Sequence, residues 1–426
     1  MKTIRNIFLS FLLINSFILK ADDSIKIGVS TFLSGGAASS FGIPLKDSLE
    51  FMFNAINEGK VPTPYDKPGI GGKRISYFFI DELGGATKQV AEFRNMVQRQ
   101  KVDVVMGYIS SGDCLAIPSV AEELKKLTIL IDCGTPRVFE ETSYKYVFRT
   151  GPHAAMDNIA GALYLKRKGI IPKRVAAINQ NYAWGHDSWA DFKNSMNVLF
   201  PSLKIVSEQF PKLFAGQYGT EISAIMVSRP DLIHSSLWGG DLESFVVQAN
   251  ARGLFRNSNV FLSAGDHVLP SLGRNMPDGV IIGARGPHGD LAPDTDLARW
   301  FKESLKKELK IKITTQPMHK GAMAILFLKK AYDDILKSTG KFPSTDEVVK
   351  YMEYLKWETP SGFAEMAIGN GHQAIQDMAI GITKWDKDEK RVKIVDIEHF
   401  NARCVNPPEN VTALNWIKEG FKGAEC

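Results

Sequence analysis

Two short turns of small polar residues have the residue types and spacing to bind an anion. The apolar segment Val104–Gly107 leads into Ser110, Ser111 and Gly112, and a helical pattern follows to about Lys125. The first amides of a helix lack intrahelical partners and lie at the positive end of its dipole, so they favour negative charge. We therefore predict a carboxylate-binding turn here, with an ordinary well-capped loop as the alternative.

The second turn follows the next apolar segment, Thr128–Ile131, and contains Asp132, Gly134 and Thr135. In a parallel sheet the carboxyl ends of neighbouring strands lie at the same edge, which is where open α/β sheets bind ligands. The hydroxyls of Ser111 and Thr135 are therefore predicted to face one shared site.

Aromatic and acidic side chains follow predicted strands in the second half of the chain. Trp184, Trp238 and Asp266 each come shortly after an apolar segment. Two indole rings and one carboxylate suit a ligand with an apolar body and a positive group, because aromatic faces also attract cations. The alternatives are packing for the tryptophans and helix capping for Asp266.

Phe41 ends a Gly/Ser-rich loop and could place a ring on the same site, while Arg285 and His288 lie where a predicted sheet ends. Arg285 is a further candidate ligand-binding residue, although a hinge or surface role is the alternative for both. No nucleophile elbow, phosphate-binding loop, zinc-binding helix or dinucleotide fingerprint occurs in the sequence. We therefore expect binding rather than catalysis, with no metal and no cofactor.

The elements that must position these residues follow a strand–helix alternation, which favours an α/β fold with parallel sheets and right-handed crossovers. A first cycle runs from Ser24 to about Arg149 and a second from Ala154 to Gly283. Helices are then predicted at 294–309, 318–337 and 345–355. A looped segment is expected at 362–371, and a hairpin at 379–384 and 392–398. Helices without strands of their own, followed by a lone hairpin, suggest that the chain recrosses between two sheets.

Composition and the N-terminus indicate an exported protein with at least two domains. The chain has 426 residues and a net charge of +5, and from Asp22 onward it carries 49 basic against 47 acidic residues. This near-neutral balance argues against a nucleic acid partner. Residues 1–21 combine Lys2 and Arg5 with the apolar run Ile7–Leu19, the pattern of a signal peptide. A retained membrane anchor is the alternative.

Export makes disulfides permissible for the four cysteines. Cys114 and Cys133 lie at the same end of the first predicted sheet, and Cys404 and Cys426 bracket the C-terminal tail. The economical pairing is Cys114 with Cys133 and Cys404 with Cys426, although four cysteines allow three connectivities.

Several motifs, in order, resemble the branched-chain amino acid (leucine/isoleucine/valine) type of periplasmic binding protein. They are Ile25-Lys-Ile-Gly-Val, Leu33-Ser-Gly-Gly, Phe41-Gly42, Asp103-Val-Val-Met-Gly, Ser110-Ser-Gly, Phe148-Arg-Thr, Trp184-Gly185, Pro230-Asp-Leu-Ile and Gly279-Val. The resemblance implies two Rossmann-like lobes joined by a three-segment hinge. Its boundaries here would be residues 24–150 with 284–375 for the first lobe and 151–283 with 376–400 for the second. Residues 401–426 would form a Cys-stapled extension.

The resemblance also implies residue roles. Ser111 and Thr135 match the positions that hold an α-carboxylate, and Asp266 matches the acidic residue that holds the ammonium. Phe41 matches an aromatic position of the cleft rim, as do Trp184 and Trp238. Tryptophan replaces the usual tyrosine at the last two positions, so a preference for leucine does not carry over.

The sequence thus predicts a monomeric periplasmic protein that captures a small amino acid-like ligand and delivers it to an ABC permease. Within the same role, the ligand could be an aromatic carboxylate or an amide such as urea. Two other classes remain open, a ligand-sensing receptor domain and a secreted hydrolase that uses Ser111 or His267.

Overall fold

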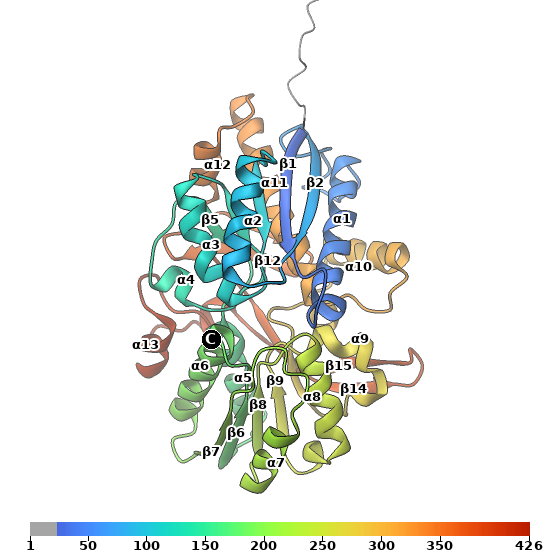
Figure 1. The fold of residues 1–426 in the computed structure, drawn as a ribbon, viewed down its shortest axis with the longest axis vertical. Coiled ribbons are helices and arrows are strands. Elements are labelled where there is room, and N and C mark those ends of the chain that lie inside the picture. Colours follow the sequence, from blue (N-terminus) through green and yellow to red (C-terminus); the bar gives the residue numbers. More distant parts are fainter. Residues whose placement is uncertain (1–23) are drawn as a thin grey trace, which may run out of the picture.

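The structure is a computed structural model in which residues 24–426 are described, and it consists of two α/β lobes, one above the other in Figure 1. Each lobe has a central sheet with helices on its faces, as the strand–helix alternation predicts. The predicted signal peptide, residues 1–21, lies outside the described residues. No helix within residues 24–426 is long and apolar enough to cross a membrane.

The first lobe contains an eight-stranded sheet in the order β11-β12-β13-β5-β4-β3-β1-β2. Its strands are β1 (Ser24–Thr31), β2 (Arg74–Asp81), β3 (Val104–Gly107), β4 (Thr128–Leu130), β5 (Val147–Arg149), β11 (Lys356–Thr359), β12 (Gly362–Ile368) and β13 (Gln373–Gln376). The strands from β2 to β13 run parallel, whereas β12 and β11 are antiparallel additions at the edge.

The second lobe contains a seven-stranded sheet in the order β15-β14-β10-β9-β8-β6-β7. Its strands are β6 (Arg174–Ile178), β7 (Lys204–Gln209), β8 (Leu232–Ser235), β9 (Asn259–Leu262), β10 (Ile281–Gly283), β14 (Met378–Asp386) and β15 (Arg391–Phe400). Strands β14 and β15 form the predicted hairpin, in which β14 runs antiparallel to β10 and β15 runs antiparallel to β14.

The helices of the described chain include η1 (Ala38–Gly42), α1 (Ile43–Asn57), α2 (Ala86–Gln98), α3 (Ser111–Glu123), α4 (Arg137–Glu140), α5 (Ala154–Arg167), α6 (Ala183–Leu199), α7 (Gly219–Ser228), α8 (Gly240–Ala251), α9 (Leu269–Leu272), α10 (Asp296–Leu309), α11 (Gln316–Thr339), α12 (Thr345–Met352) and α13 (Ala413–Lys418). Helices α10, α11 and α12 lie close to the predicted ranges 294–309, 318–337 and 345–355. Helix α12 begins with a capping box formed by Ser344 and Glu347, a motif that supplies partners for the unpaired amides of the first turn.

The chain passes between the two sheets three times. It leaves the first sheet after β5, returns after β10, and crosses again between β13 and β14. Beyond β15 the C-terminal segment, residues 401–426, packs through α13 against α6. The economical disulfide pairing is confirmed, since Cys114 bonds to Cys133 and Cys404 bonds to Cys426.

The prediction of a looped segment at 362–371 was wrong. Residues 362–368 form β12 and residues 373–376 form β13, and both extend the first sheet. Buried and half-buried residues alternate along most of β12, the period expected of a strand. Gly369 and Gly371, both with positive φ, make the turn that follows. The first lobe therefore contains strands from this late part of the chain, contrary to the expectation of helices alone.

Candidate ligand-binding site

A small cavity, here called the interlobe cavity, lies between the lobes at the carboxyl ends of the central strands. Its volume is about 20 Å³, which is about enough for one water molecule. It is lined by Phe41, Ile109, Ser111, Asp132, Gly134, Tyr182, Trp184, Trp238, Ala264 and Arg285. The predicted residues Ser110, Thr135 and Asp266 are not part of this lining.

Aromatic rings from both lobes form much of the cavity wall. Phe41, from η1 of the first lobe, meets the Trp238 ring edge to face, with centroids 5.6 Å apart. The second lobe fixes its tryptophans by hydrogen bonds: Trp184 Nε1 donates to Ser236 O (2.8 Å), and Trp238 Nε1 donates to the Tyr182 hydroxyl (2.8 Å). The Phe41 and Trp238 rings come from different lobes, so they are in contact only when the lobes are close together.

The predicted anion seat at the start of α3 is partly filled by a carboxylate of the chain itself. Glu82, just after β2, accepts hydrogen bonds from the amides of Ile109 (2.8 Å) and Ser110 (2.8 Å). Burial, together with the neighbouring Asp113, raises the pKa of the Glu82 carboxyl well above its usual range. An internal carboxyl group therefore occupies the amides of Ile109 and Ser110, just before α3, and the binding of a ligand anion at this turn stays a prediction.

The two polar turns lie side by side as predicted, but only the Ser111 hydroxyl, and not that of Thr135, faces the interlobe cavity. Ser111 Oγ accepts hydrogen bonds from the amides of Gly134 (3.2 Å) and Thr135 (3.1 Å), which leaves the hydroxyl proton of Ser111 available for a ligand. A Cβ at Gly134 would lie 2.2 Å from Trp184 Cζ3 and 2.8 Å from Arg285 Nη2. Only glycine fits at this position while the lobes are closed.

Thr135 links the lobes directly. Its hydroxyl donates to Asp187 Oδ2 of α6 (2.6 Å) and therefore faces the second lobe rather than the cavity lining. Arg149 also stabilises this turn, because its Nη1 donates hydrogen bonds to the carbonyl oxygens of Cys133 (3.1 Å) and Thr135 (2.6 Å).

A buried charge cluster occupies the floor of the interlobe cavity. Arg285 Nη1 pairs with Asp132 Oδ1 (2.5 Å), its Nε pairs with Asp157 Oδ2 (3.0 Å), and its Nη2 donates to Pro152 O (2.6 Å). The guanidinium also lies over the Trp184 ring, 4.5 Å from the centroid. Burial raises the pKa of Asp157 to about 6 despite the two nearby cations.

Lys320, on α11, completes this cluster although it is fully buried. Its Nζ donates to Asp132 Oδ1 and to Gln316 Oε1 (2.9 Å), and burial lowers its pKa to about 8. The other oxygen of Asp132, Oδ2, is buried without a hydrogen-bond partner. Because Asp132 lines the cavity, it can accept a hydrogen bond from an ammonium or amide group of a ligand.

Asp266 is buried next to α11. Its Oδ2 accepts from the amide of Gln316 (2.7 Å), the first residue of that helix, and its Oδ1 has no partner. Burial raises the pKa of this carboxyl to about 7. The neighbouring His267 is also engaged, since its Nε2 accepts from the Gly239 amide (2.9 Å). The ammonium-binding role of Asp266 stays a prediction.

Sequence reasoning missed several residues of the site, chiefly Tyr182, Lys320 and Asp157. A lysine within the apolar stretch of α11 and an aspartate inside α5 were available signals, because charged residues are rarely fully buried unless paired. Asp132 was named only as part of its turn. Within residues 24–426, no group of three His, Cys, Asp or Glu side chains could hold a metal ion.

The fold and this cavity define a class of protein, and the sequence comparisons agree. Residues 24–390 match the family model described as "Periplasmic binding protein". The chain therefore belongs to the periplasmic binding protein family, whose type I fold is the one observed.

Individual relatives are distant. The "Leu/Ile/Val-binding protein homolog 4" of Brucella abortus is 24% identical over 246 residues, covering 54% of this chain, and the match spans about half (55%) of that relative's length. A solved solute-binding protein of Rhodopseudomonas palustris, in complex with 3,4-dihydroxybenzoic acid, has a TM-score of 0.75 at 22% identity, covering 91% of this chain and 99% of that one. A leucine-, isoleucine-, valine-, threonine- and alanine-binding protein of Brucella ovis in a closed conformation has a TM-score of 0.72 at 19% identity, covering 91% and 97%.

Proposed function

We propose that this protein captures a small amino acid-like ligand between its lobes and delivers it to an ABC importer. The supporting observation is the interlobe cavity, in which the Ser111 hydroxyl can donate and the unpartnered Asp132 Oδ2 can accept. A ligand that contacts both lobes binds the closed form better than the open form, so it shifts the population toward closure. The permease would recognise that closed shape.

The cavity of about 20 Å³ sets a condition on the mechanism. A ligand larger than water requires the Trp184 ring to turn aside or the lobes to separate further than they do here. We expect the ligand carboxylate at Ser111 and its ammonium at Asp132, with Asp266 as the sequence-based alternative for the ammonium. Arg285 is already paired, so its expected role is to hold the cavity floor and the Trp184 ring.

An aromatic carboxylate is the second candidate ligand. Four aromatic side chains and Arg285 line the cavity, and the ligand named for the Rhodopseudomonas palustris protein is an aromatic acid. Movement of Trp184 away from Arg285 would free a guanidinium face for such a ligand.

The test is a thermal-shift screen of refolded, ligand-stripped protein against amino acids, amides and aromatic acids. A ligand at about a hundred times its Kd adds about 2.7 kcal/mol of stability, which is readily seen. Titrations of Asp132→Asn and Asp266→Asn then assign the ammonium partner, since only the correct substitution should weaken an amino acid strongly. Aromatic acids bound equally by both variants would favour the second candidate. A ligand consumed during incubation would contradict a binding role.

The remaining expectations follow from the family. We propose export through the signal peptide at residues 1–21, a periplasmic location, and a monomer that releases its ligand unchanged to the permease.

A further inference from the structure

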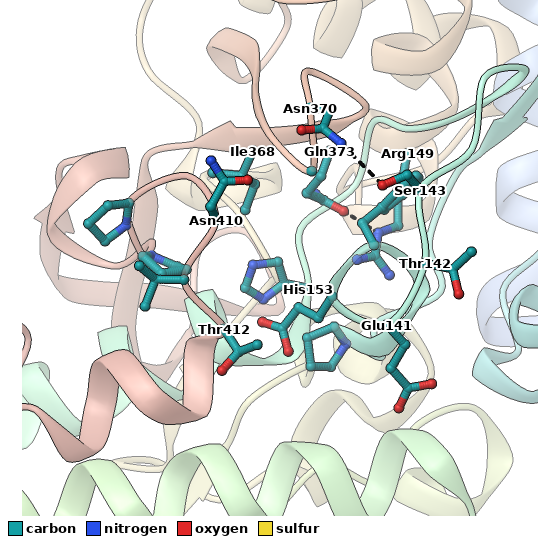
Figure 2. A pocket seen from close by; sticks show the side chains of 17 residues that line it. Glu141, Thr142, Ser143, Arg149, His153, Ile368, Asn370, Gln373, Asn410 and Thr412 are labelled. Atoms are coloured by element: carbon teal, nitrogen blue, oxygen red, sulfur yellow. Dashed lines mark hydrogen bonds between the residues drawn. The ribbon is translucent and has the colours of Figure 1, made fainter.

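A second cavity, here called the hinge pocket, lies where the C-terminal segment meets the first lobe (Figure 2). Its volume is about 370 Å³, far larger than that of the interlobe cavity. Three segments form its walls: α4 with the loop to Ser143, residues 368–373, and residues 407–412 beyond the second sheet. His153 lies on the connection after β5, and Gln373 begins β13, the strand before the third connection, so the pocket borders two of the connections between the lobes.

Arg149, in the wall of this pocket, is a buried cation without an ion-pair partner among the described residues. The side chain is fully buried, and its Nε donates to Gln373 Oε1 while its Nη1 donates to two carbonyl oxygens. Its Nη2 has no hydrogen-bond partner, and no carboxylate within residues 24–426 lies at ion-pair distance. A buried cation without an anion is costly, and a bound anion would remove that cost.

His153 supplies a second unpartnered nitrogen in the same pocket. The residue is buried, and its Nδ1 has no partner. In the view of Figure 2 the His153 ring lies between Arg149 and the segment that carries Asn410 and Thr412. Arg149 Nη2 can donate to an oxygen of a carboxylate or phosphate, and His153 Nδ1 can do so in the tautomer that carries its proton there.

The acidic side chains of the pocket wall are engaged elsewhere. Glu140 accepts from the amide of Ala413 (2.6 Å), and Glu141 pairs with Arg137 (2.7 Å). Burial raises the pKa of Glu140, and the hydrogen bond from Ala413 and the charge of Arg149 counteract that rise. The rim is exposed and polar at Thr142, Ser143 and Asn410, so a solute can enter the pocket.

We propose that the hinge pocket is a second binding site, which takes a small oxyanion of the carboxylate or phosphate class on Arg149 and His153. This second site is separate from the interlobe cavity, and the C-terminal segment forms one of its walls.

Calorimetric titration of the full protein with inorganic phosphate and, separately, with acetate tests this site. We expect saturable binding of at least one probe, and the probe that binds assigns the class. Arg149→Met should weaken it by about tenfold or more, the scale of a hydrogen bond to a charged group. Absence of saturable binding of both probes to the wild-type protein would overturn the proposal.

Thr412 offers a matched pair of variants that keeps the fold. Its side chain caps α13 by accepting from the Asn415 amide, and both Asp and Asn are good caps. Thr412→Asp adds a negative charge to the pocket and should weaken the oxyanion, whereas Thr412→Asn should leave its affinity unchanged. Equal affinity in wild type, Thr412→Asp and Arg149→Met would place the anion elsewhere, for example in the interlobe cavity, and would overturn the proposal.

Discussion

Two buried arginines, one in each pocket, have opposite electrostatic surroundings. Arg285 pairs with Asp132 and Asp157. Although burial lowers the pKa of Arg285, these two charges raise it above the usual value. Arg149 has no such partner, and burial, followed by the charge of Arg285, lowers its pKa to about 9.

This difference shows what each pocket can take. Asp132 and Asp157 neutralise the charge of Arg285. The groups that remain to bind a ligand in the interlobe cavity are therefore the Ser111 hydroxyl and Oδ2 of Asp132. Arg149 has no ion-pair partner in the described part of the chain and is therefore available to a bound anion. A buried arginine therefore indicates an anion site only where its carboxylates are missing, and the following substitutions test the distinction.

Replacing each arginine should give the largest changes in the free energy of unfolding, and the two changes should differ between Arg285 and Arg149. Arg285→Met leaves Asp157 buried and unpaired, and Asp132 with Lys320 as its remaining cation. It should therefore lower the free energy of unfolding by about 3–5 kcal/mol. Arg149→Met loses hydrogen bonds to neutral oxygens and should cost about 1–3 kcal/mol. Urea unfolding at pH 7 measures both. Equal losses would contradict the contrast between the two sites.

Gly134→Ala should affect the interlobe cavity alone. The added Cβ would lie 2.2 Å from the Trp184 ring, an overpacking that costs about 1–3 kcal/mol. We expect weaker binding of the cleft ligand and unchanged oxyanion binding in the hinge pocket, both by calorimetry. Gly112→Ala is the matched control, because its Cβ meets only Ser110 Oγ at 3.6 Å. Similar losses in the two variants would argue against a closure contact at Gly134.

The pH dependence of stability should have opposite signs in the two regions. Burial raises the pKa of Asp266 to about 7, so its contribution to stability falls as pH rises from about 4 to 7. Burial lowers the pKa of His153 well below its usual value, so its contribution falls as pH drops below about 6.5.

Two variants isolate these contributions. Relative to wild type, Asp266→Asn should be more stable at pH 7 than at pH 5, and His153→Asn should show the reverse. Each difference should be on the order of 1 kcal/mol, the scale of a one-unit pKa shift. Unfolding curves at the two pH values measure them, and differences of the same sign would contradict the assignment.

The smallest effect is expected at the link between the lobes. Thr135→Val removes the hydrogen bond to Asp187, worth about 1 kcal/mol, so affinity for the cleft ligand should fall by about fivefold. Thr135→Ser keeps the hydroxyl and is the control. Unchanged affinity in the valine variant would mean that this bond does not stabilise closure.

The fold and the two polar turns were accessible from the sequence because they depend on local pattern. Strands β3 and β4 are neighbours in a parallel sheet, so the meeting of Ser111 with Gly134 and Thr135 follows from strand order. The disulfide between Cys114 and Cys133 follows from the same arrangement.

The contacts of the site that the sequence did not predict are made by side chains from segments that are far apart in the chain. Lys320 meets Asp132 from a helix that is 188 residues away in sequence, and Glu82 fills amides at the start of α3 from the end of β2. No periodicity encodes such contacts. Strand β13 was missed because glutamines at both ends leave it without an apolar run, whereas the equally short β3 is apolar throughout.

The most direct test of the central claim is a crystal structure of the protein with the strongest ligand of the screen. The account predicts ligand density between the lobes, with hydrogen bonds to the Ser111 hydroxyl and Asp132 Oδ2 and with Trp184 displaced or the lobes further apart. Ligand density away from these residues, with the interlobe cavity unchanged, would contradict it.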